Sequence, residues 1–332
     1  MSQIVLTAVG DPAENARLEA TPALKVGADD VLVQMEVAPV NPVDFLFSMG
    51  WYGVQPVLPN VLGAEGVGRV REVGAAADQS LVGKRVVVLG TYEFGVWGDT
   101  VVVPARYVVA VREDVDGGQV SMAVINPITA HLMLTRYVDL KPGDWIGQTL
   151  GNSALAHSVV ALASEAGLKT LSVVRSEKAA AEARAAGADV VLVDGDDLGD
   201  RVAKALDGEQ LRLVLDGASG NTQAALTNAL EFGGTVVSYS SATGEAPVMP
   251  LGTFVYGEVI HRGIWVVNWF RTAPRAEIEE VVTKMVDLVA RGVLSVPVDS
   301  TFSLDEYQEA FARHNSADRA GKVLFTFSAA KS

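Results

Sequence analysis

From about Ser121 onward the chain alternates short apolar runs with helical, often Ala-rich segments, and this alternation constrains the fold more than any other feature. It is typical of βαβ units, in which each crossover helix returns the chain so that successive strands pair in parallel. Helices are predicted at Pro127–Leu134, Ala154–Ala166 and Glu177–Ala186. Strands are predicted at Trp145–Leu150, Thr170–Val174, Val190–Val193, Leu211–Leu215, Thr235–Tyr239 and Ile264–Val267. Six such strands predict an α/β fold with a doubly wound parallel sheet.

The first third of the chain has a different texture, with short apolar runs separated by Gly, Pro and Asp. Such runs at Val31–Val37, Val86–Leu89 and Val101–Val103 predict an all-β or barrel-like unit. After the amphipathic stretch Glu277–Arg291, the final run Val323–Phe327 is expected to pair back with this first unit. The predicted division is a β-rich substrate domain of residues 1–121 and 294–332, and a dinucleotide-binding domain of residues 122–293.

Composition excludes several classes of protein. The 332 residues, 49% of them hydrophobic, suffice for two packed cores. Apolar runs stay shorter than the roughly 18–20 residues of a spanning helix, and Met1–Val5 lacks the basic start of a signal peptide, so we expect a cytoplasmic protein without membrane partners. Zero cysteines exclude disulfides, thiolate catalysis and cysteine-ligated zinc. The net charge of −14 opposes nucleic acid as a partner.

The turn after the first predicted strand of the parallel sheet is a candidate nucleotide site. Small residues there let backbone N–H groups and a helix N-terminus approach a pyrophosphate closely. The predicted contacts are Gly151, Asn152, Ser153, Ala154 and Leu155. The full three-glycine fingerprint is absent, and a short Ala-rich turn also occurs where a helix simply packs tightly on a sheet.

The end of the second strand bears on the choice of nucleotide. An acidic residue there would hold the ribose 2′-hydroxyl of NAD, whereas this chain has Arg175, Ser176, Glu177 and Lys178. A planar guanidinium, a hydroxyl and a second cation suit a 2′-phosphate, so NADP(H) is favoured, with Arg175, Ser176 and Lys178 as its contacts. The alternative is a solvated loop whose charges serve solubility, and Glu177 keeps it open.

Several motifs along nearly the whole chain resemble one known family. They are Asn41-Pro42-Val43-Asp44, Gly50-Trp51-Tyr52, Gly63-Ala64-Glu65-Gly66-Val67-Gly68, Asn126-Pro127-Ile128-Thr129-Ala130 with Leu132-Met133-Leu134-Thr135, Pro142-Gly143-Asp144-Trp145, Val174-Arg175, Gly263-Ile264-Trp265 and Gly321-Lys322-Val323. The chain resembles the quinone-oxidoreductase side of the medium-chain dehydrogenase/reductase superfamily. The Asn-Pro-x-Thr-Ala-x-x-Met-Leu stretch and the early Gly-x-Tyr are similar to those of the 2-enoyl thioester reductases, which act on enoyl-CoA or enoyl-ACP.

The resemblance implies a GroES-like substrate domain, a Rossmann-type nucleotide domain, NADPH as cofactor and a homodimer paired through sheet edges near Ile264–Val267. Zinc alcohol dehydrogenases have Gly-His-Glu where this chain has Gly63-Ala64-Glu65, and its four histidines show no ligand spacing. We therefore expect no metal, and a zinc-independent oxidoreductase.

Enoyl thioester reduction needs a hydride at Cβ, stabilisation of charge on the thioester oxygen and a proton at Cα. Tyr52 matches the tyrosine to which the resembling family assigns the last two tasks, although Trp51 and Tyr52 would equally form an aromatic loop anchor. Asn41 and Asp44 favour turns and could fix the loop that carries Tyr52. Thr129 resembles the family's residue beside the nicotinamide, and is otherwise a local hydrogen-bonding group of a helix first turn.

The remaining predicted contacts fall into two sets. Large aromatic residues could line a substrate pocket, although core packing is the commoner fate of any one of them. The predicted substrate contacts are Trp51, Phe94, Trp97, Trp265 and Trp269. The further predicted cofactor contacts are Asn41, Thr129, Tyr239, Trp265 and Lys322. Two alternatives stay open beside the enoyl thioester reductase: a quinone or activated-alkene reductase of the same fold, and a non-enzymatic relative of the kind found among lens proteins.

Overall fold

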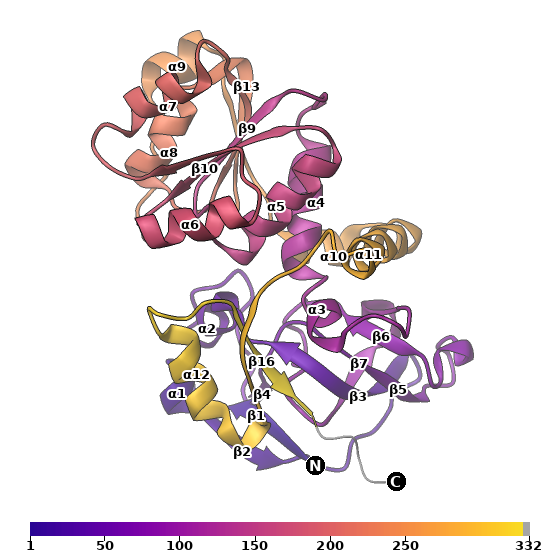
Figure 1. Cartoon of the computed structure of the whole chain (residues 1–332). Helices are drawn as coiled ribbons and strands as arrows, with labels where there is room; N and C mark the ends of the chain where they lie inside the picture. The colour runs from indigo at the N-terminus through magenta and orange to yellow at the C-terminus, as the bar shows by residue number, and fades with distance from the viewer. Residues whose placement is uncertain (328–332) are drawn as a thin grey trace. The chain divides into compact units, whose positions relative to one another are not determined.

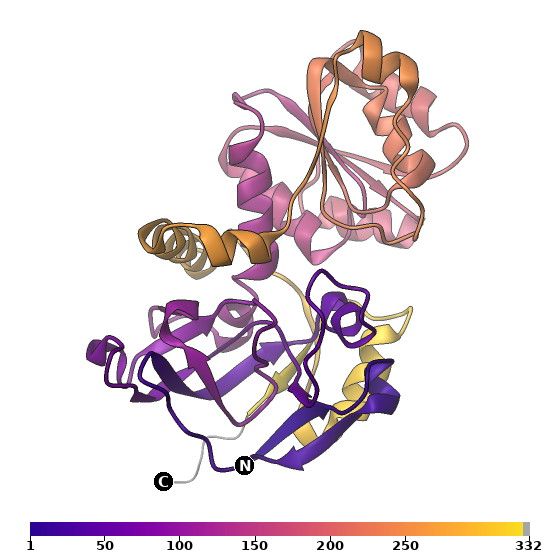
Figure 2. The same cartoon turned by 180° about the vertical axis from the view of Figure 1, so that it is seen from behind.

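The computed structural model describes residues 1–327, which form two compact units. The first unit comprises Met1–Ile125 and the chain from Val267 onward, and the second comprises Asn126–Val266 (Figures 1 and 2). The segment 267–293 is predicted as part of the nucleotide domain, but in the structure it belongs to the first compact unit. The predicted domain boundaries therefore stay a prediction, and residues 328–332 of the predicted β-rich domain lie outside the described residues.

The second unit is built on a six-stranded parallel sheet. Its strands are β9 (Trp145–Gln148), β10 (Lys169–Val174), β11 (Val190–Val193), β12 (Leu211–Asp216), β13 (Leu230–Ser238) and β14 (Ile260–Gly263). The spatial order β11-β10-β9-β12-β13-β14 reverses direction between β9 and β12, and all five neighbouring pairs are parallel. The prediction of a doubly wound parallel sheet is confirmed.

Helices cover both faces of this sheet, α5 and α6 on one face and α7 and α8 on the other (Figure 1). Their bounds are α4 (Ile125–Arg136), α5 (Ala154–Glu165), α6 (Glu177–Ala185), α7 (Leu198–Leu206), α8 (Gly220–Thr227) and α9 (Leu251–Tyr256). Leu198, Val202 and Leu206 recur every four residues along α7 and pack with Leu211 and Val236 of the sheet. This one-sided apolar face is what holds the helix on the sheet.

The sixth strand was predicted in the wrong place. The structure has the edge strand β14 at Ile260–Gly263, whereas Val266–Thr272 is the helix α10. An apolar run of four residues does not distinguish a short strand from a helix by its period. The real strand includes His261 and Arg262, because a strand at a sheet edge tolerates polar and charged side chains.

The first unit is rich in strands. They are β1 (Ser2–Leu6), β2 (Ala16–Ala20), β3 (Asp30–Pro39), β4 (Asn60–Val61), β5 (Gly66–Val73), β6 (Arg85–Val88), β7 (Thr100–Pro104), β8 (Val108–Ala110), β15 (Val298–Phe302) and β16 (Lys322–Thr326). A three-stranded sheet has the order β2-β1-β4, and a seven-stranded sheet runs β15-β16-β3-β5-β6-β8 with β7 also on β3. Strand β16 pairs antiparallel with β3, which confirms that the tail returns to the first unit.

Helices and 3₁₀ turns complete the first unit. They are α1 (Pro12–Asn15), α2 (Pro42–Ser48), α3 (Gly117–Ser121), α10 (Val266–Thr272), α11 (Arg275–Ala290), α12 (Tyr307–Asn315) and the 3₁₀ turns Gln79–Leu81, Ala105–Tyr107 and Leu304–Glu306. Helix α11 belongs here because the guanidinium of Arg275 donates to the carbonyl oxygens of Arg106 and Val108 at 2.8 and 2.7 Å. Within residues 1–327, helices long and apolar enough to cross a membrane are absent.

Candidate functional site

The turn that follows β9 fits closely against the neighbouring strand. Gly151 donates its N–H to the carbonyl oxygen of Val173 in β10 at 2.9 Å, and a Cβ at this position would lie 2.7 Å from the Cβ of Ser172. Leu150 turns the chain with φ +52°, and the Ser153 hydroxyl then caps α5 by accepting from the Ala156 N–H at 3.1 Å. The α5 N-terminus therefore follows directly on a turn that only glycine fits, as a pyrophosphate site requires.

A buried carboxylate ties this turn to the one after β12. The Thr149 hydroxyl donates to Oδ1 of Asp216 at 3.0 Å and accepts from the N–H groups of Gly217 and Ala218 at 2.8 and 3.1 Å. Oδ1 of Asp216 also accepts from the Ser219 N–H at 3.0 Å. Both turns lie at the carboxyl ends of adjacent strands where the strand order reverses, the usual place for a dinucleotide in this kind of sheet.

Tyr239, predicted to contact the cofactor, follows β13 at the same edge of the sheet. A Cβ on Gly217 would lie 2.5 Å from its ring, so the turn after β12 is shaped to admit this side chain. Burial, and then the nearby Asp216 carboxylate, raise the pKa of Tyr239, while a hydrogen bond with Ser153 lowers it. Tyr239 therefore reaches the first turn of α5 as a neutral phenol.

The end of β10 carries the predicted phosphate-binding cations on its surface. Arg175 and Lys178 are exposed. The hydroxyl of Ser176 caps α6 by accepting from the Ala179 N–H at 3.3 Å. Glu177 is the acidic residue that kept the alternative of a solvated loop open. Its Oε2 lies 3.9 Å from Nη1 of Arg184, so it forms an ion pair within α6.

One contact at this edge was not foreseen. Asn152 donates from Nδ2 to Oε2 of Glu182 in α6 at 2.8 Å. A carboxylate therefore lies beside the turn expected to hold a diphosphate. The sequence gives little signal for it, since the two residues are thirty positions apart and Glu182 occurs in an ordinary Ala-rich helix.

In the first unit, Asn41 and Asp44 form a capping box at the start of α2. Oδ2 of Asp44 accepts from the Asn41 N–H at 2.8 Å, and Nδ2 of Asn41 donates to Oε1 of Glu65 at 3.0 Å. Oε2 of Glu65 accepts from the Ile125 N–H at 2.8 Å, and the ammonium of Lys322 donates to Oδ1 of Asn41. The loop-fixing role weighed for Asn41 and Asp44 matches this geometry, whereas the cofactor contacts of Asn41 and Lys322 stay predictions.

Burial dominates the electrostatics of this cluster. It raises the pKa of Asp44 to about 7, against the Asn41 N–H and the Lys322 charge, which lower it. Burial also raises the pKa of Glu65 and lowers that of Lys322 to about 8. Two acids and one base therefore share a buried site whose ionised forms are all disfavoured by desolvation.

Tyr52 lies next to this cluster. Its half-buried ring meets the ring of Tyr92 edge-on, with centroids 5.0 Å apart and an interplanar angle of 62°. Tyr92 is buried and donates to Oδ1 of Asp44 at 3.4 Å. Trp51 is 74% exposed, so the tyrosine and not the tryptophan anchors the loop to the unit.

The other predicted aromatic contacts divide by burial. Trp97 is fully buried, donates its indole N–H to the Pro39 carbonyl at 3.3 Å and packs on Phe311 and Phe325 at 5.5 and 5.2 Å. It is a core residue, so we do not propose Trp97 as a substrate contact. Trp269 is likewise buried and donates to Glu277 at 3.0 Å.

Three predicted residues keep their assignments as predictions. Phe94 is half-buried with its ring 5.8 Å from that of Tyr107 in the first unit. Thr129 is buried in α4, and Trp265 is half-buried between β14 and α10.

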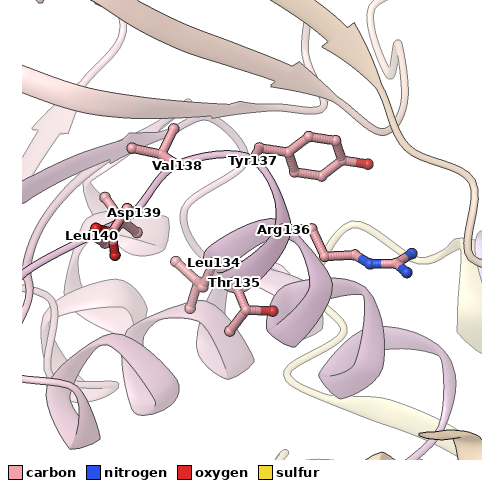
Figure 3. A pocket seen from close by; sticks show the side chains of 7 residues that line it. All are labelled: Leu134, Thr135, Arg136, Tyr137, Val138, Asp139 and Leu140. Carbon is pink, nitrogen blue, oxygen red and sulfur yellow. The ribbon is translucent and has the colours of Figure 1, made fainter.

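A pocket at the end of α4 is lined by the contiguous segment Leu134–Leu140, whose side chains spread around the turn in Figure 3. It contains none of the predicted site residues. Across residues 1–327, groups of three or more His, Cys, Asp or Glu side chains placed to hold a metal are absent. The expected independence from zinc stays a prediction.

Two family models match this chain. Residues 27–113 match the alcohol dehydrogenase GroES-like domain, and residues 186–324 match the model described as zinc-binding dehydrogenase. The mitochondrial enoyl-[acyl-carrier-protein] reductase of Rattus norvegicus is 31% identical over 307 residues, which cover 91% of this chain and 82% of the relative.

Solved structures agree with this fold. A mycobacterial quinone oxidoreductase is 25% identical with a TM-score of 0.88, and a mycobacterial structure complexed with NADPH is 26% identical with a TM-score of 0.86. Each comparison covers 98% of this chain and 99% of the other. The sequence resemblance is confirmed at this level: the chain belongs to the medium-chain dehydrogenase/reductase superfamily of oxidoreductases.

Proposed function

We propose that this protein is an NADPH-dependent reductase of the C=C bond of 2-enoyl thioesters carried by coenzyme A or acyl carrier protein. The observation that carries the proposal is the placement of Tyr52, whose ring rests against the buried Tyr92 while its loop neighbour Trp51 is exposed. The similarity to mitochondrial enoyl-[acyl-carrier-protein] reductases supports the substrate class.

The second unit fits NADPH. Because Gly151 has no Cβ, the turn can lie close to Ser172 of β10. The backbone of residues 151–155 would hold the pyrophosphate. Arg175 and Lys178 are exposed at the end of β10, where they would take the 2′-phosphate. When bound, NADPH supplies the hydride that reduces Cβ of the substrate.

Tyr52 would serve the other half of the reduction. Its hydroxyl would donate a hydrogen bond to the thioester carbonyl oxygen as negative charge develops there, or would deliver a proton to Cα. The ring contact with Tyr92 restricts the positions that this hydroxyl can take. A donor held in place before the reaction stabilises developing charge better than one that must reorient.

A quinone or activated-alkene reductase is the second candidate, favoured by the similarity to the mycobacterial quinone oxidoreductase. Quinone reduction requires no carbon protonation, because its protons go to oxygen, so in a quinone reductase Tyr52 would be only an aromatic loop anchor. The tyrosine hydroxyl therefore separates the two candidates.

The test is Tyr52→Phe, assayed with a crotonyl thioester and with a benzoquinone. The substitution keeps the ring that contacts Tyr92 and removes only the hydroxyl, so folding and NADPH binding should be close to unchanged. We expect kcat on the enoyl thioester to fall by about 10²–10³-fold, with a much smaller effect on quinone reduction. If Tyr52→Phe retains most of its enoyl thioester kcat, the quinone or alkene reductase takes the lead.

We also propose a homodimer formed through the free edge of β14, in place of the predicted edge near Ile264–Val267. Strand β14 is the last strand of the six-stranded sheet, and Ile260 on it is 43% exposed. Every residue of the preceding helix α9 is exposed or half-buried, including Leu251 at 75% and Tyr256 at 84% exposure. A second copy related by a two-fold axis would pair β14 with itself and cover this apolar helix.

A further inference from the structure

We infer that Tyr92 is a positioning residue for the reaction: it fixes the ring of Tyr52 and is itself fixed by Asp44. This inference rests on the proposed role of Tyr52. Tyr92 lies in the segment between β6 and β7, and it was not among the residues singled out from the sequence. Every contact in the argument lies within the first unit.

The backbone of Tyr92 is strained. Its φ is +61°, a left-handed conformation that is uncommon for residues other than glycine and asparagine. Such a conformation persists when the surrounding structure determines it, and it is found preferentially at functional sites. The side chain is only 4% exposed, so the residue with this strained backbone has its ring inside the unit.

Three neighbours contact the Tyr92 side chain. The ring of Phe47 in α2 is tilted against it, with centroids 4.9 Å apart, and the ring of Tyr52 meets it edge-on at 5.0 Å. The hydroxyl donates to Oδ1 of Asp44 at 3.4 Å, while Oδ2 of the same carboxyl accepts the Asn41 N–H. Asp44 therefore joins the α2 cap to the ring on which Tyr52 rests.

The hydroxyl distinguishes this arrangement from simple packing. Burial, and then the Asp44 carboxylate, raise the pKa of Tyr92 well above its ordinary value, so the phenol stays a donor. A phenylalanine would fill nearly the same volume and leave the ring free to shift along Phe47. Since a small misplacement of a catalytic group can cost a large factor in rate, the anchor at Asp44 has a kinetic consequence.

The experiment is a double-mutant cycle of Tyr92→Phe and Tyr52→Phe. We expect Tyr92→Phe alone to lower kcat on a crotonyl thioester by about tenfold, with KM and benzoquinone reduction nearly unchanged. In the Tyr52→Phe background the same substitution should cause no further loss, because Tyr92 acts only through the Tyr52 hydroxyl. The matched control is Tyr307→Phe, which also removes a hydroxyl donating at 3.3 Å, to Ala16, and should leave both activities unchanged.

The outcomes separate the two proposals. If Tyr52→Phe lowers the enoyl thioester kcat but folded Tyr92→Phe does not, the positioning role is wrong and the proposed function stands. Equal losses from Tyr92→Phe in both backgrounds, or on both substrates, would make Tyr92 a structural residue. If Tyr52→Phe itself has no effect, both proposals fail. Should Tyr92→Phe not fold, Phe47→Leu loosens the packing of the same ring, and its loss must likewise be confined to the enoyl thioester and absent in the Tyr52→Phe background.

Discussion

The buried ammonium of Lys322 donates a hydrogen bond to Oδ1 of Asn41, a residue 281 positions earlier in the chain. The contact joins strand β16 to the cap of α2. Nδ2 of Asn41 in turn donates to Oε1 of Glu65 at 3.0 Å. One cation thus serves a site that also contains the Asp44 carboxyl. Because all of these groups are buried, the site links the stability of the fold to pH.

The Asp44 carboxyl should make the protein less stable as the pH rises from about 4 to about 7. Its pKa is 3.8 in the unfolded chain and about 7 when folded, so in this interval the folded state binds more protons and the free energy of unfolding falls with pH. At about 1.4 kcal/mol per pKa unit, the total is at most roughly 4 kcal/mol. Asp44→Asn, an isosteric change, should remove this slope in urea unfolding measured at pH 4, 5.5 and 7.

The matched control for this measurement is Asp29→Asn, which changes an exposed carboxylate. The difference in unfolding free energy between wild type and Asp29→Asn should not vary with pH. Glu65, Lys322 and Tyr92 face Asp44 and are unchanged in both variants, so they cancel in the comparison to first order. A pH-independent difference for Asp44→Asn as well would show that folding leaves the pKa of this carboxyl unchanged.

Gly151→Ala should impair NADPH binding through steric overlap alone. The added Cβ would lie 2.7 Å from the Ser172 Cβ, so the turn or strand β10 must shift, at a cost of about 1–3 kcal/mol in stability. We expect NADPH affinity, measured by fluorescence titration, to fall by at least about tenfold. Gly199→Ala is the control: nothing lies within 4 Å of its added Cβ in α7, and it should stabilise the protein by about 0.5–1 kcal/mol. Undiminished binding by Gly151→Ala would place the pyrophosphate elsewhere.

Arg175→Ala should weaken NADPH and leave NADH nearly unchanged. Arg175 is exposed at the end of β10, so its removal disturbs little packing. Losing a charged contact to the 2′-phosphate should cost about 1.5–3 kcal/mol, roughly one to two decades in affinity. Isothermal titration with both cofactors checks this, with Arg184→Ala, another exposed arginine, in the last turn of α6, as the control. Equal weakening of both cofactors would mean that Arg175 does not read the 2′-phosphate.

The sequence predicts the parts of this molecule that depend on local pattern. The turn at Gly151 is found because a strand, a small residue and a helix follow one another directly, and the structure has them there. Thr149 and Asp216 are 67 positions apart, and Asp44 and Tyr92 are 48 apart, so their hydrogen bonds exist only once the sheets have formed. Residues whose role is set by such pairings carry no local signal.

The same distinction explains the misplaced sixth strand. Ile264–Val267 is the more apolar segment and is the one predicted as a strand, whereas Ile260–Gly263 has His261 and Arg262 in its centre. Hydrophobicity identifies central strands well, because both of their faces are buried. It fails at the edge, where pairing with β13 on one side is enough to form the strand.

The corrected edge gives a last prediction, that Ile260→Lys and Tyr256→Lys convert a dimer to monomers. Ile260 is on the edge strand β14, and Tyr256 is the most exposed large hydrophobic residue of α9, at 84%. At a two-fold interface each substitution places two like charges close together and desolvates them, so a single change acts twice. Light scattering after size exclusion at micromolar concentration should show a dimer for the wild type and a monomer for either variant. Val82→Lys, at a position 53% exposed in the first unit, should remain a dimer. A monomeric wild type, or variants that stay dimeric, would reject pairing through β14. Either result would leave the proposed chemistry standing, because the Gly151 turn and Tyr52 lie within one chain.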